Sequence, residues 1–156
     1  MTRQKIKTCL WFDRNAEEAA RFYVSVFKDH GDSAVTGITP GLNGAALVVA
    51  FRLAGVEFIA LNGGPHFRFT EAISLSVDCR SQEELDELWE RLSAGGSPGR
   101  CGWLKDRYGL SWQIVPAVLP KLLAAADPAQ ARRVMDALMG MTKLDIRALA
   151  AAADAK

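Results

Sequence analysis

The sequence predicts an α+β fold made of two similar halves and a helical tail, and three observations support this prediction. First, a strand pattern, a helix pattern and further strand patterns follow one another in residues 6–62 and again in residues 71–116. Second, the composition changes from residue 117 onward to Ala, Leu and Met. Third, 156 residues suffice for one compact domain or for two small modules that share a core. A small sheet whose helix covers one face needs its sibling for the other, which accounts for the repeat.

The first half opens with a strand over residues 6–12 and continues with an amphipathic helix that ends near Phe27. Apolar side chains recur there every three or four residues, two glutamates occupy the first turn, and Asn15 is expected to cap the helix. Residues 45–64 read as two apolar strands joined at Ala54-Gly55. The predicted order is therefore strand, helix, strands.

The second half repeats this order. Residues 71–79 form a strand pattern, and Ser81 with Glu84 three residues later forms a capping box that predicts the start of a helix. Gly95-Gly96 is expected to end that helix. Residues 101–106 and 110–116 read as the strands that follow.

The tail is predicted to be helical. Asp127 with Pro128 predicts a helix start, Gly140 a helix stop, and Thr142 with Asp145 the opening of a final helix. Four apolar side chains are expected to pack against the back of a sheet or against a partner chain: Val134, Leu138, Met139 and Met141.

Composition excludes several classes of partner. The chain has 19 Lys and Arg residues against 18 Asp and Glu residues, and the two signs are mixed along the sequence. Nucleic acids and anionic membranes favour a concentrated basic face, so we expect neither as a partner. No stretch approaches the roughly 20 apolar residues of a membrane span, and no secretory signal is evident. The three cysteines lack zinc-ligand spacing, which fits reduced thiols and a cytoplasmic location.

Common catalytic motifs are absent from the sequence. Neither GxGxxG nor GxxxxGK[ST] occurs, so no phosphate cradle is predicted, and residues 109–113 (GLSWQ) lack the second glycine of a nucleophile elbow. His30 and His66 read as ordinary polar residues in loops. Four charged residues near the last turn fit either a solvated hairpin tip or the rim of a site for an anionic substrate: Arg100, Lys105, Asp106 and Arg107.

Motifs of one family are present in four segments: LWFDRNAEEAARFYVSVF, FIALNGGPHFRFTEAISLSV, CGWLKDRYGLSWQIVP and RVMDALMGMTKLDI. Together they resemble the PhnB-like proteins of the vicinal oxygen chelate superfamily, which includes glyoxalase and bleomycin-resistance proteins; several members carry the name 3-demethylubiquinone-9 3-methyltransferase. The resemblance implies paired βαβββ modules that form curved sheets around a cavity, and commonly a homodimer. The modules would span residues 1–66 and 67–116, followed by a helical extension over residues 117–156.

The resemblance also implies where a metal would lie. Metalloenzymes of the superfamily bind a divalent ion through His, Gln or Glu side chains, and Gln113 falls at the position of a metal-binding Glu. The other positions fall on Thr8, on Ala72 or Glu71, and on Leu61 or Asn62. An alanine has no donor atom, and threonine and asparagine offer weak neutral oxygens where transition metals prefer imidazole, thiolate or carboxylate. The sequence therefore predicts no metal and no other cofactor.

The predicted function is binding of a small molecule in a metal-free cavity. Mostly apolar clefts with a few polar groups are typical of such sites. The candidate ligand-binding residues are Thr8, Asn62, Gln113, Phe12, Phe69 and Trp103. Gln113 is expected to point into the cavity and to bond to a neighbour such as Thr8, to water or to the ligand, while Trp112 points into the core.

The alternative is an enzyme of the superfamily. It would be a lyase, an isomerase or a transferase, with or without a metal, and the methyl transfer in the family's name is one such activity. Glu71 and Gln113, with His66 nearby in sequence, support this alternative. In either case the exposed edges of open sheets and the Met- and Leu-rich tail predict a homodimer.

Overall fold

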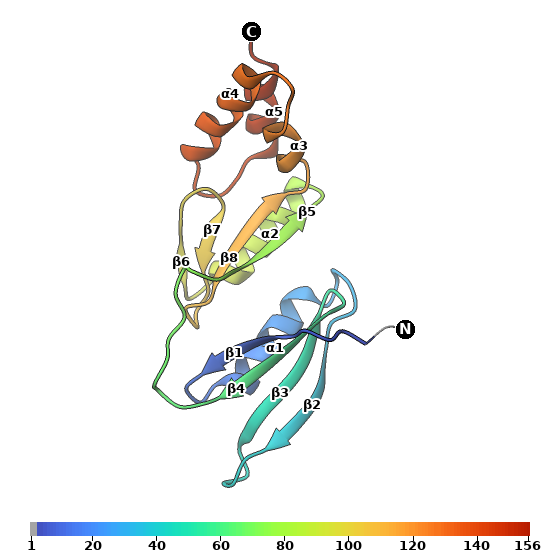
Figure 1. Ribbon diagram of the computed structural model, residues 1–156, viewed down its shortest axis with the longest axis vertical. Helices are drawn as coiled ribbons and strands as arrows, with labels where there is room; N and C mark the ends of the chain where they lie inside the picture. The colour runs from blue at the N-terminus through green and yellow to red at the C-terminus, as the bar shows by residue number, and fades with distance from the viewer. Residues whose placement is uncertain (1–2) are drawn as a thin grey trace. The chain divides into compact units, whose positions relative to one another are not determined.

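The computed structural model describes residues 3–156, and within them the chain forms two four-stranded sheets and five helices. The chain divides into two compact units, the first ending at Phe69 and the second running from Thr70 to Lys156. Both units have the order strand, helix, strands, so the α+β class expected from the sequence is confirmed (Figure 1).

The first unit is one sheet with one helix. Its strand order is β1-β4-β3-β2, with β1 parallel to β4 and the other neighbours antiparallel (Figure 1). The elements are β1 (Thr8–Phe12), α1 (Ala16–Phe27), β2 (Ala34–Pro40), β3 (Ala46–Leu53) and β4 (Val56–Asn62).

Helix α1 packs on the sheet face where alternate strand residues are large and apolar. Phe51 of β3 and Phe58 of β4 are cross-strand partners whose stacked rings have centroids 5.4 Å apart. Tyr23 of α1 stacks on Phe51 with a centroid separation of 6.3 Å. All three side chains are buried. Each aromatic pair contributes about 0.5–1.5 kcal/mol beyond its burial, so these rings hold the helix on the sheet.

The cap of α1 differs from the sequence prediction. Asn15 lies at the N-cap position, but its side chain makes no capping hydrogen bond. Instead, Asn62 at the end of β4 accepts from the backbone N of Ala16 through Oδ1 at 2.9 Å and donates through Nδ2 to the carbonyl of Ala46 at 2.8 Å. The helix start is therefore capped by a residue that is near in space and distant in sequence.

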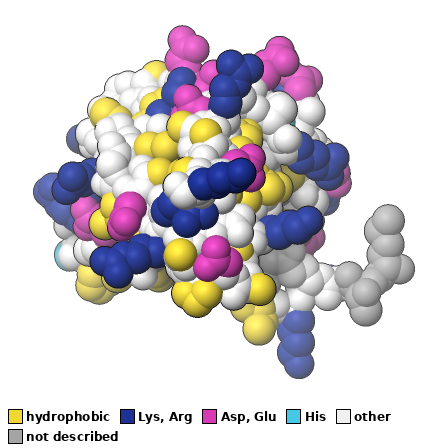
Figure 2. All heavy atoms as spheres, turned by 90° about the horizontal axis from the view of Figure 1, so that it is seen from above, with side chains coloured by type: hydrophobic (Ala, Val, Ile, Leu, Met, Phe, Trp, Pro, Cys, Tyr) yellow, Lys and Arg dark blue, Asp and Glu magenta, His cyan; other side chains and the backbone are white. Residues whose placement is uncertain are grey.

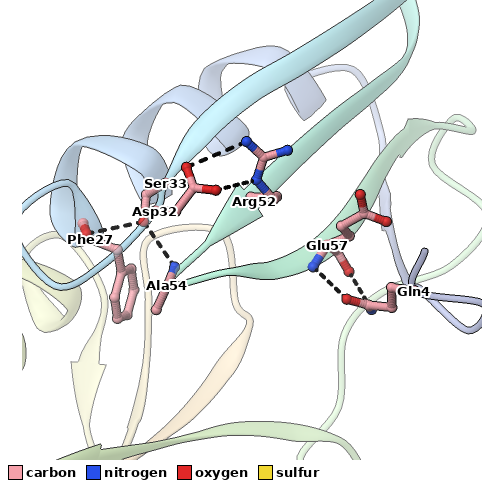
Figure 3. Close-up of polar contacts among 7 residues, drawn as sticks. All are labelled: Gln4, Phe27, Asp32, Ser33, Arg52, Ala54 and Glu57. Atoms are coloured by element: carbon pink, nitrogen blue, oxygen red, sulfur yellow. Dashed lines mark hydrogen bonds and ion pairs between the residues drawn. The ribbon is translucent and has the colours of Figure 1, made fainter. Parts of the chain in front are cut away.

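Side-chain polar contacts tie together the irregular parts of the first unit (Figure 3). The hydroxyl of Ser33 donates to the carbonyl of Phe27 at 3.1 Å and accepts from the backbone N of Ala54 at 2.9 Å. This links the end of α1 to the β3–β4 turn. The amide of Gln4 bonds to the carbonyl and to the N of Glu57, which extends the pairing along β4 beyond the start of β1.

The second unit repeats the arrangement and adds the tail. Its strand order is β5-β8-β7-β6, with β5 parallel to β8. The elements are β5 (Ser74–Cys79), α2 (Gln82–Ser93), β6 (Ser97–Pro98), β7 (Trp103–Lys105), β8 (Ser111–Pro116), α3 (Leu119–Leu123), α4 (Pro128–Met139) and α5 (Ile146–Asp154). The predicted cap of α2 by Ser81 is confirmed, and the carboxylate of Glu84 bonds to the residue before the cap. Ser81 Oγ accepts from Glu84 N at 3.1 Å, and Glu84 Oε2 accepts from Arg80 N at 2.7 Å.

The helical tail belongs to the second unit, not to a separate body. Gln82 at the start of α2 accepts from the backbone N of Ile146 at 2.8 Å and donates to the carbonyl of Leu144 at 3.1 Å. Gly102 packs against the same segment, because a Cβ there would lie 2.9 Å from Leu144 Cδ1. Glycine is also required by the positive φ of 83° at this position.

Both predicted helix starts in the tail are confirmed, and the capping residue of the second is corrected. Asp127 accepts from Ala129 N at 3.0 Å and caps α4. The cap of α5 is Asp145, which accepts from Ala148 N at 2.9 Å, so Thr142 lies before the helix and does not open it. Of the four apolar tail residues, Val134 and Leu138 are buried, Met141 is half-buried and Met139 is exposed.

The face of the protein seen in Figure 2 mixes both signs of charge. Figure 2 shows basic and acidic side chains interspersed, with apolar side chains between them. No helix in residues 3–156 is both long enough and apolar enough to span a membrane.

Candidate ligand site

The sheet of the second unit has one covered face and one open face, and the register separates their residues. Helix α2 packs on β7 and β8 from one side, where Leu104, Trp112 and Ile114 are buried. Alternation places the neighbours of these residues on the other side, here called the open face. Cross-strand partners form two rows on it. The first row is Ser74, Ser111, Lys105 and Ser97, and the second is Ser76, Gln113 and Trp103.

Gln113 lies on the open face, opposite Trp112, as alternation predicts. Its Nε2 donates to the hydroxyl of Ser74 at 2.9 Å, and its side chain is half-buried. Trp112 is 1 % exposed. The hydrogen-bond partner of Gln113 is thus a serine on the neighbouring strand, whereas Thr8, named from the sequence, lies in the first unit.

Asp106 corrects one sequence interpretation. The sequence predicts that Asp106 belongs to a solvated hairpin tip or a charged rim together with Arg100, Lys105 and Arg107. Its side chain is instead buried. The carboxylate accepts from Tyr108 N at 2.8 Å, from Leu110 N at 3.1 Å and from the indole Nε1 of Trp112 at 2.8 Å. Asp106 therefore fixes the β7–β8 turn and holds Trp112 in the core.

A cavity of about 340 Å³ borders the first row and is here called the Ser111 cavity. Its lining combines hydroxyl, charged and aromatic side chains: Glu71, Ser97, Pro98, Gly99, Arg100, Trp103, Leu104, Lys105 and Ser111. Two glycines on either side of β6 let the backbone of this segment lie close to β7. A Cβ at Gly96 would lie 2.0 Å from the carbonyl oxygen of Lys105, and one at Gly99 would lie 2.8 Å from that of Trp103.

Some polar groups around the Ser111 cavity have hydrogen-bond or ion-pair partners, and others have none. Lys105 forms an ion pair with Glu71, and hydrogen bonding by Lys105 is the main cause that lowers the pKa of the Glu71 carboxyl below its ordinary value. Arg100 has no side-chain hydrogen bond or ion pair with any residue in the described range 3–156. Ser111 is 1 % exposed, and its Oγ has no hydrogen-bond partner among those residues. A buried hydroxyl without a partner costs about 1–3 kcal/mol, so a ligand that bonds to it would gain affinity.

Cys9 and Cys79 do not supply a reactive thiolate to this site. Burial raises the pKa of the Cys79 thiol to about 12, and burial also raises the pKa of Cys9. Both thiols are therefore protonated at neutral pH.

Four of the residues named from the sequence lie in the first unit. Thr8 and Phe12 share the face of Phe58 and Asn62, with which they pair, and α1 covers this face. Phe12 is 3 % exposed and packs edge-on against Phe69, with centroids 5.3 Å apart. Both polar groups of Asn62 are used in the α1 cap.

On the second sheet, the structure brings together the two remaining residues named from the sequence. Trp103 and Gln113 are cross-strand partners on the open face of the second sheet. A role of any of the six named residues in ligand binding stays a prediction.

The sequence analysis missed three side chains of the open face: Ser74, Ser76 and Ser111. A signal for them is present, because SLSVDC in residues 74–79 alternates polar and apolar residues and predicts one polar face. Glu71 and Ala72, considered from the resemblance as first-strand positions, precede β5, and Ser74 is the strand residue that pairs with Ser111.

The open face does not fit the metal that the superfamily resemblance implies. The groups near Gln113 are the hydroxyls of Ser74 and Ser76, and a neutral amide with two hydroxyls is a poor donor set for a transition metal. Residues 3–156 contain no group of three or more His, Cys, Asp or Glu side chains placed to hold a metal ion.

Comparison with known proteins identifies a family. The model of the family described as 3-demethylubiquinone-9 3-methyltransferase matches residues 4–115. A solved structure of a PhnB protein from Bacillus cereus, named as a candidate 3-demethylubiquinone-9 3-methyltransferase, is 34 % identical, with a TM-score of 0.67 over 73 % of this chain and 100 % of that one. Protein PA1353 from Pseudomonas aeruginosa is 19 % identical, with a TM-score of 0.56 over 70 % and 95 % of the two chains, and shares the fold. Among curated proteins, none matches the sequence.

Proposed function

We propose that this chain, which belongs to the 3-demethylubiquinone-9 3-methyltransferase family of PhnB-like proteins in the vicinal oxygen chelate superfamily, binds a small molecule without a metal. The observation that carries the proposal is the open face of the second sheet. At the position where the superfamily's metalloenzymes would have a carboxylate, Gln113 forms a neutral hydrogen-bonded pair with Ser74.

The chemistry of this face supports recognition of a ligand. Gln113 donates one N–H to Ser74, while its carbonyl oxygen has no hydrogen-bond partner among the described residues. Trp103 beside it offers a half-buried aromatic surface. Trp103 also borders the Ser111 cavity, whose volume of about 340 Å³ is in the range of small-molecule sites, whereas Gln113 is not among the residues that line it. Neutral amide and hydroxyl groups bind and orient a ligand but supply no Lewis acid.

The proposal is tested by ligand binding with a chelator present. The full chain is screened by thermal shift and ligand-observed NMR against small aromatic compounds that carry a carbonyl, hydroxyl or carboxylate group, in EDTA. We expect binders whose affinity falls about tenfold in Gln113→Leu, because one hydrogen bond and its geometry are lost. Gln130→Leu on α4 is the matched control and should bind like the wild type.

Two results would contradict metal-free binding. One is a stoichiometric content of Zn, Ni, Mn or Fe in protein purified without chelator or affinity-tag metal. The other is binding that disappears in EDTA and returns when one of these metals is added.

The alternative function is an enzyme of the superfamily. The observation in its favour is the carboxylate of Glu71 beside the Ser111 cavity, since a carboxylate near a bound ligand has the chemistry of a general base. The two functions differ in the fate of the compound. A bound compound recovered unchanged by mass spectrometry after long incubation supports binding, and a product of altered mass supports the enzyme.

The proposal includes assembly as a homodimer in the cytoplasm. Strand β2 is an edge strand with mostly exposed residues, and the apolar side chains of Ile38, Leu47 and Val56 in the same unit are exposed. An exposed strand edge with apolar neighbours favours pairing with a second chain. Light scattering is expected to give twice the chain mass of 17.0 kDa, and a mass of one chain at micromolar concentration would contradict the dimer.

A further inference from the structure

The charges around the Ser111 cavity indicate what kind of ligand it accepts. Two cations, Arg100 and Lys105, border the cavity together with one carboxylate, Glu71. Glu71 neutralises Lys105 through an ion pair, whereas Arg100 has no partner in the part of the chain that the structure describes. A guanidinium stays charged at all physiological pH values and presents donors in a planar fork that matches a carboxylate or a phosphonate. The cavity thus has an excess of positive charge suited to an anion.

Ser111 supplies a second, independent observation. Its side chain lies on the open face as the cross-strand partner of Lys105, is 1 % exposed and borders the cavity. No hydrogen bond satisfies its Oγ among residues 3–156. The Ser111 hydroxyl can donate a hydrogen bond to an anionic oxygen of a ligand, which would give Oγ the partner that it lacks.

Trp103 sets the shape of the rest of the ligand. It borders the same cavity and lies half-buried on the open face, two residues along β7 from Lys105 in the row of Ser111. Indole faces favour stacking with flat rings. The cavity volume of about 340 Å³ is near the lower end of the range for ligand sites, roughly 300–1,000 Å³, which fits a ligand with a single ring.

Glu71 occupies the charged group that an anionic ligand would use, the ammonium of Lys105. It lies in an irregular segment before β5, its carboxylate is largely exposed, and it occupies the ammonium of Lys105. Arg100, Ser111 and Lys105 border the same cavity, and Ser111 is the cross-strand partner of Lys105, so a ligand carboxylate in this cavity is a second anion available to Lys105. We infer that the Ser111 cavity binds a single-ring molecule with a carboxylate or phosphonate group, and that Glu71 competes with this anion for Lys105. The inference rests on the proposed function and names its ligand class.

The test uses four probes with the full chain in EDTA: benzoate and phenylphosphonate, with benzamide and benzyl alcohol as neutral analogues. Affinities are measured by protein-observed NMR titration. The anions are expected to bind at least about tenfold more tightly than the neutral analogues. Arg100→Gln should weaken anion binding by about tenfold, and Ser111→Ala by a few-fold, with little effect on the neutral probes. Arg100→Lys should fall between Arg100→Gln and wild type, since it keeps the charge and loses the fork.

The Glu71→Gln variant is expected to raise the affinity for the anions, whereas a folding defect would lower it. Removing the competing carboxylate should tighten anion binding by about threefold or more, because Lys105 becomes available. Glu90→Gln on α2 has the same charge change as Glu71→Gln, and Arg132→Gln on α4 has the same charge change as Arg100→Gln. Both are matched controls and should leave the affinities unchanged. Melting temperatures of all variants show that each is folded.

The outcomes separate this inference from the proposed function. Equal affinity for anions and neutral analogues, weaker binding in Glu71→Gln, or no anion binding up to about 10 mM would overturn the inference. If benzamide still binds without metal and is lost in Gln113→Leu, the proposed function stands and only the anionic ligand class is wrong. If compounds bind only after a metal is added, the proposed function fails as well.

Discussion

The two units share a topology and differ in the chemistry of one sheet face. Strand order β1-β4-β3-β2 in the first unit corresponds to β5-β8-β7-β6 in the second, with a parallel outer pair in each. The face opposite α1 carries apolar side chains over much of its area: Trp11, Val48, Ala50, Ile59 and Leu61. The equivalent face of the second sheet carries four serines, a glutamine and a lysine among its residues.

The difference shows which residues determine the fold and which determine the chemistry. The helix-covered faces are apolar in both units because they form the cores, and these patterns produce the shared topology. Among the described residues, the open face of the second unit carries a hydrogen-bonded polar pair, Gln113 with Ser74, and a buried hydroxyl without a hydrogen-bond partner, that of Ser111. Function therefore has to be argued from the open face and not from the topology.

The largest expected effect comes from Trp112 on the covered face of the second sheet. Trp112→Ala removes a buried ring and its hydrogen bond to Asp106, which should lower the free energy of unfolding by about 3–5 kcal/mol. Trp103→Ala on the open face should cost only about 1 kcal/mol, since Trp103 is half-buried. Urea unfolding followed by circular dichroism measures both. Equal costs would mean that the two faces are not distinct.

A medium effect is expected from the helix caps, which also differ between the units. Helix α1 is capped by Asn62 from β4, whereas α2 is capped by Ser81 next to it in sequence. Asn62→Ala should lower the free energy of unfolding by about 1–2 kcal/mol, because two part-buried hydrogen bonds are lost. Asn15→Ala should change it by less than about 0.5 kcal/mol. The reverse ranking, measured in urea, would show that Asn15 is the cap in solution.

The smallest effect concerns the charge pair at the second open face. Lys105 lowers the pKa of the Glu71 carboxyl in the folded state. Ionised Glu71 therefore stabilises the folded protein at pH values above the pKa that Glu71 has in the unfolded chain. This stabilisation is lost as the pH falls through the lower pKa of the folded state. A carbon-13 titration should therefore find the Glu71 carboxyl midpoint below the ordinary glutamate value and return it toward that value in Lys105→Met. An unchanged midpoint in the variant would show that the ion pair does not form in solution.

Local signals in the sequence suffice for most of the secondary structure. The Ser81 and Glu84 capping box, the Ala54-Gly55 turn and the Asp127 cap each involve neighbouring residues, so the sequence alone reveals them. Strand β2 was not expected as an element because its passage is rich in glycine, and pairing with β3 at the sheet edge supplies its order.

The candidate site depends on contacts that a local pattern does not contain. Asn62 caps α1 from 46 residues away, and the bond between Gln113 and Ser74 spans 39 residues. The placement of Thr8 follows from its pairing with Phe58, which counting residues along the chain does not reveal. The resemblance located Gln113, but the register between β5 and β8 was needed to find its partner.

The central claim is that the open face of the second sheet is a metal-free ligand site, and an NMR titration tests it most directly. Nitrogen-15-labelled full chain is titrated with phenylphosphonate and benzamide in EDTA. The account predicts that the chemical shift changes concentrate on Ser74, Trp103, Lys105, Ser111 and Gln113, with no comparable changes on the open face of the first sheet near Trp11 and Ile59. Changes confined to the first sheet, or changes that appear only after a divalent metal replaces the chelator, would contradict it.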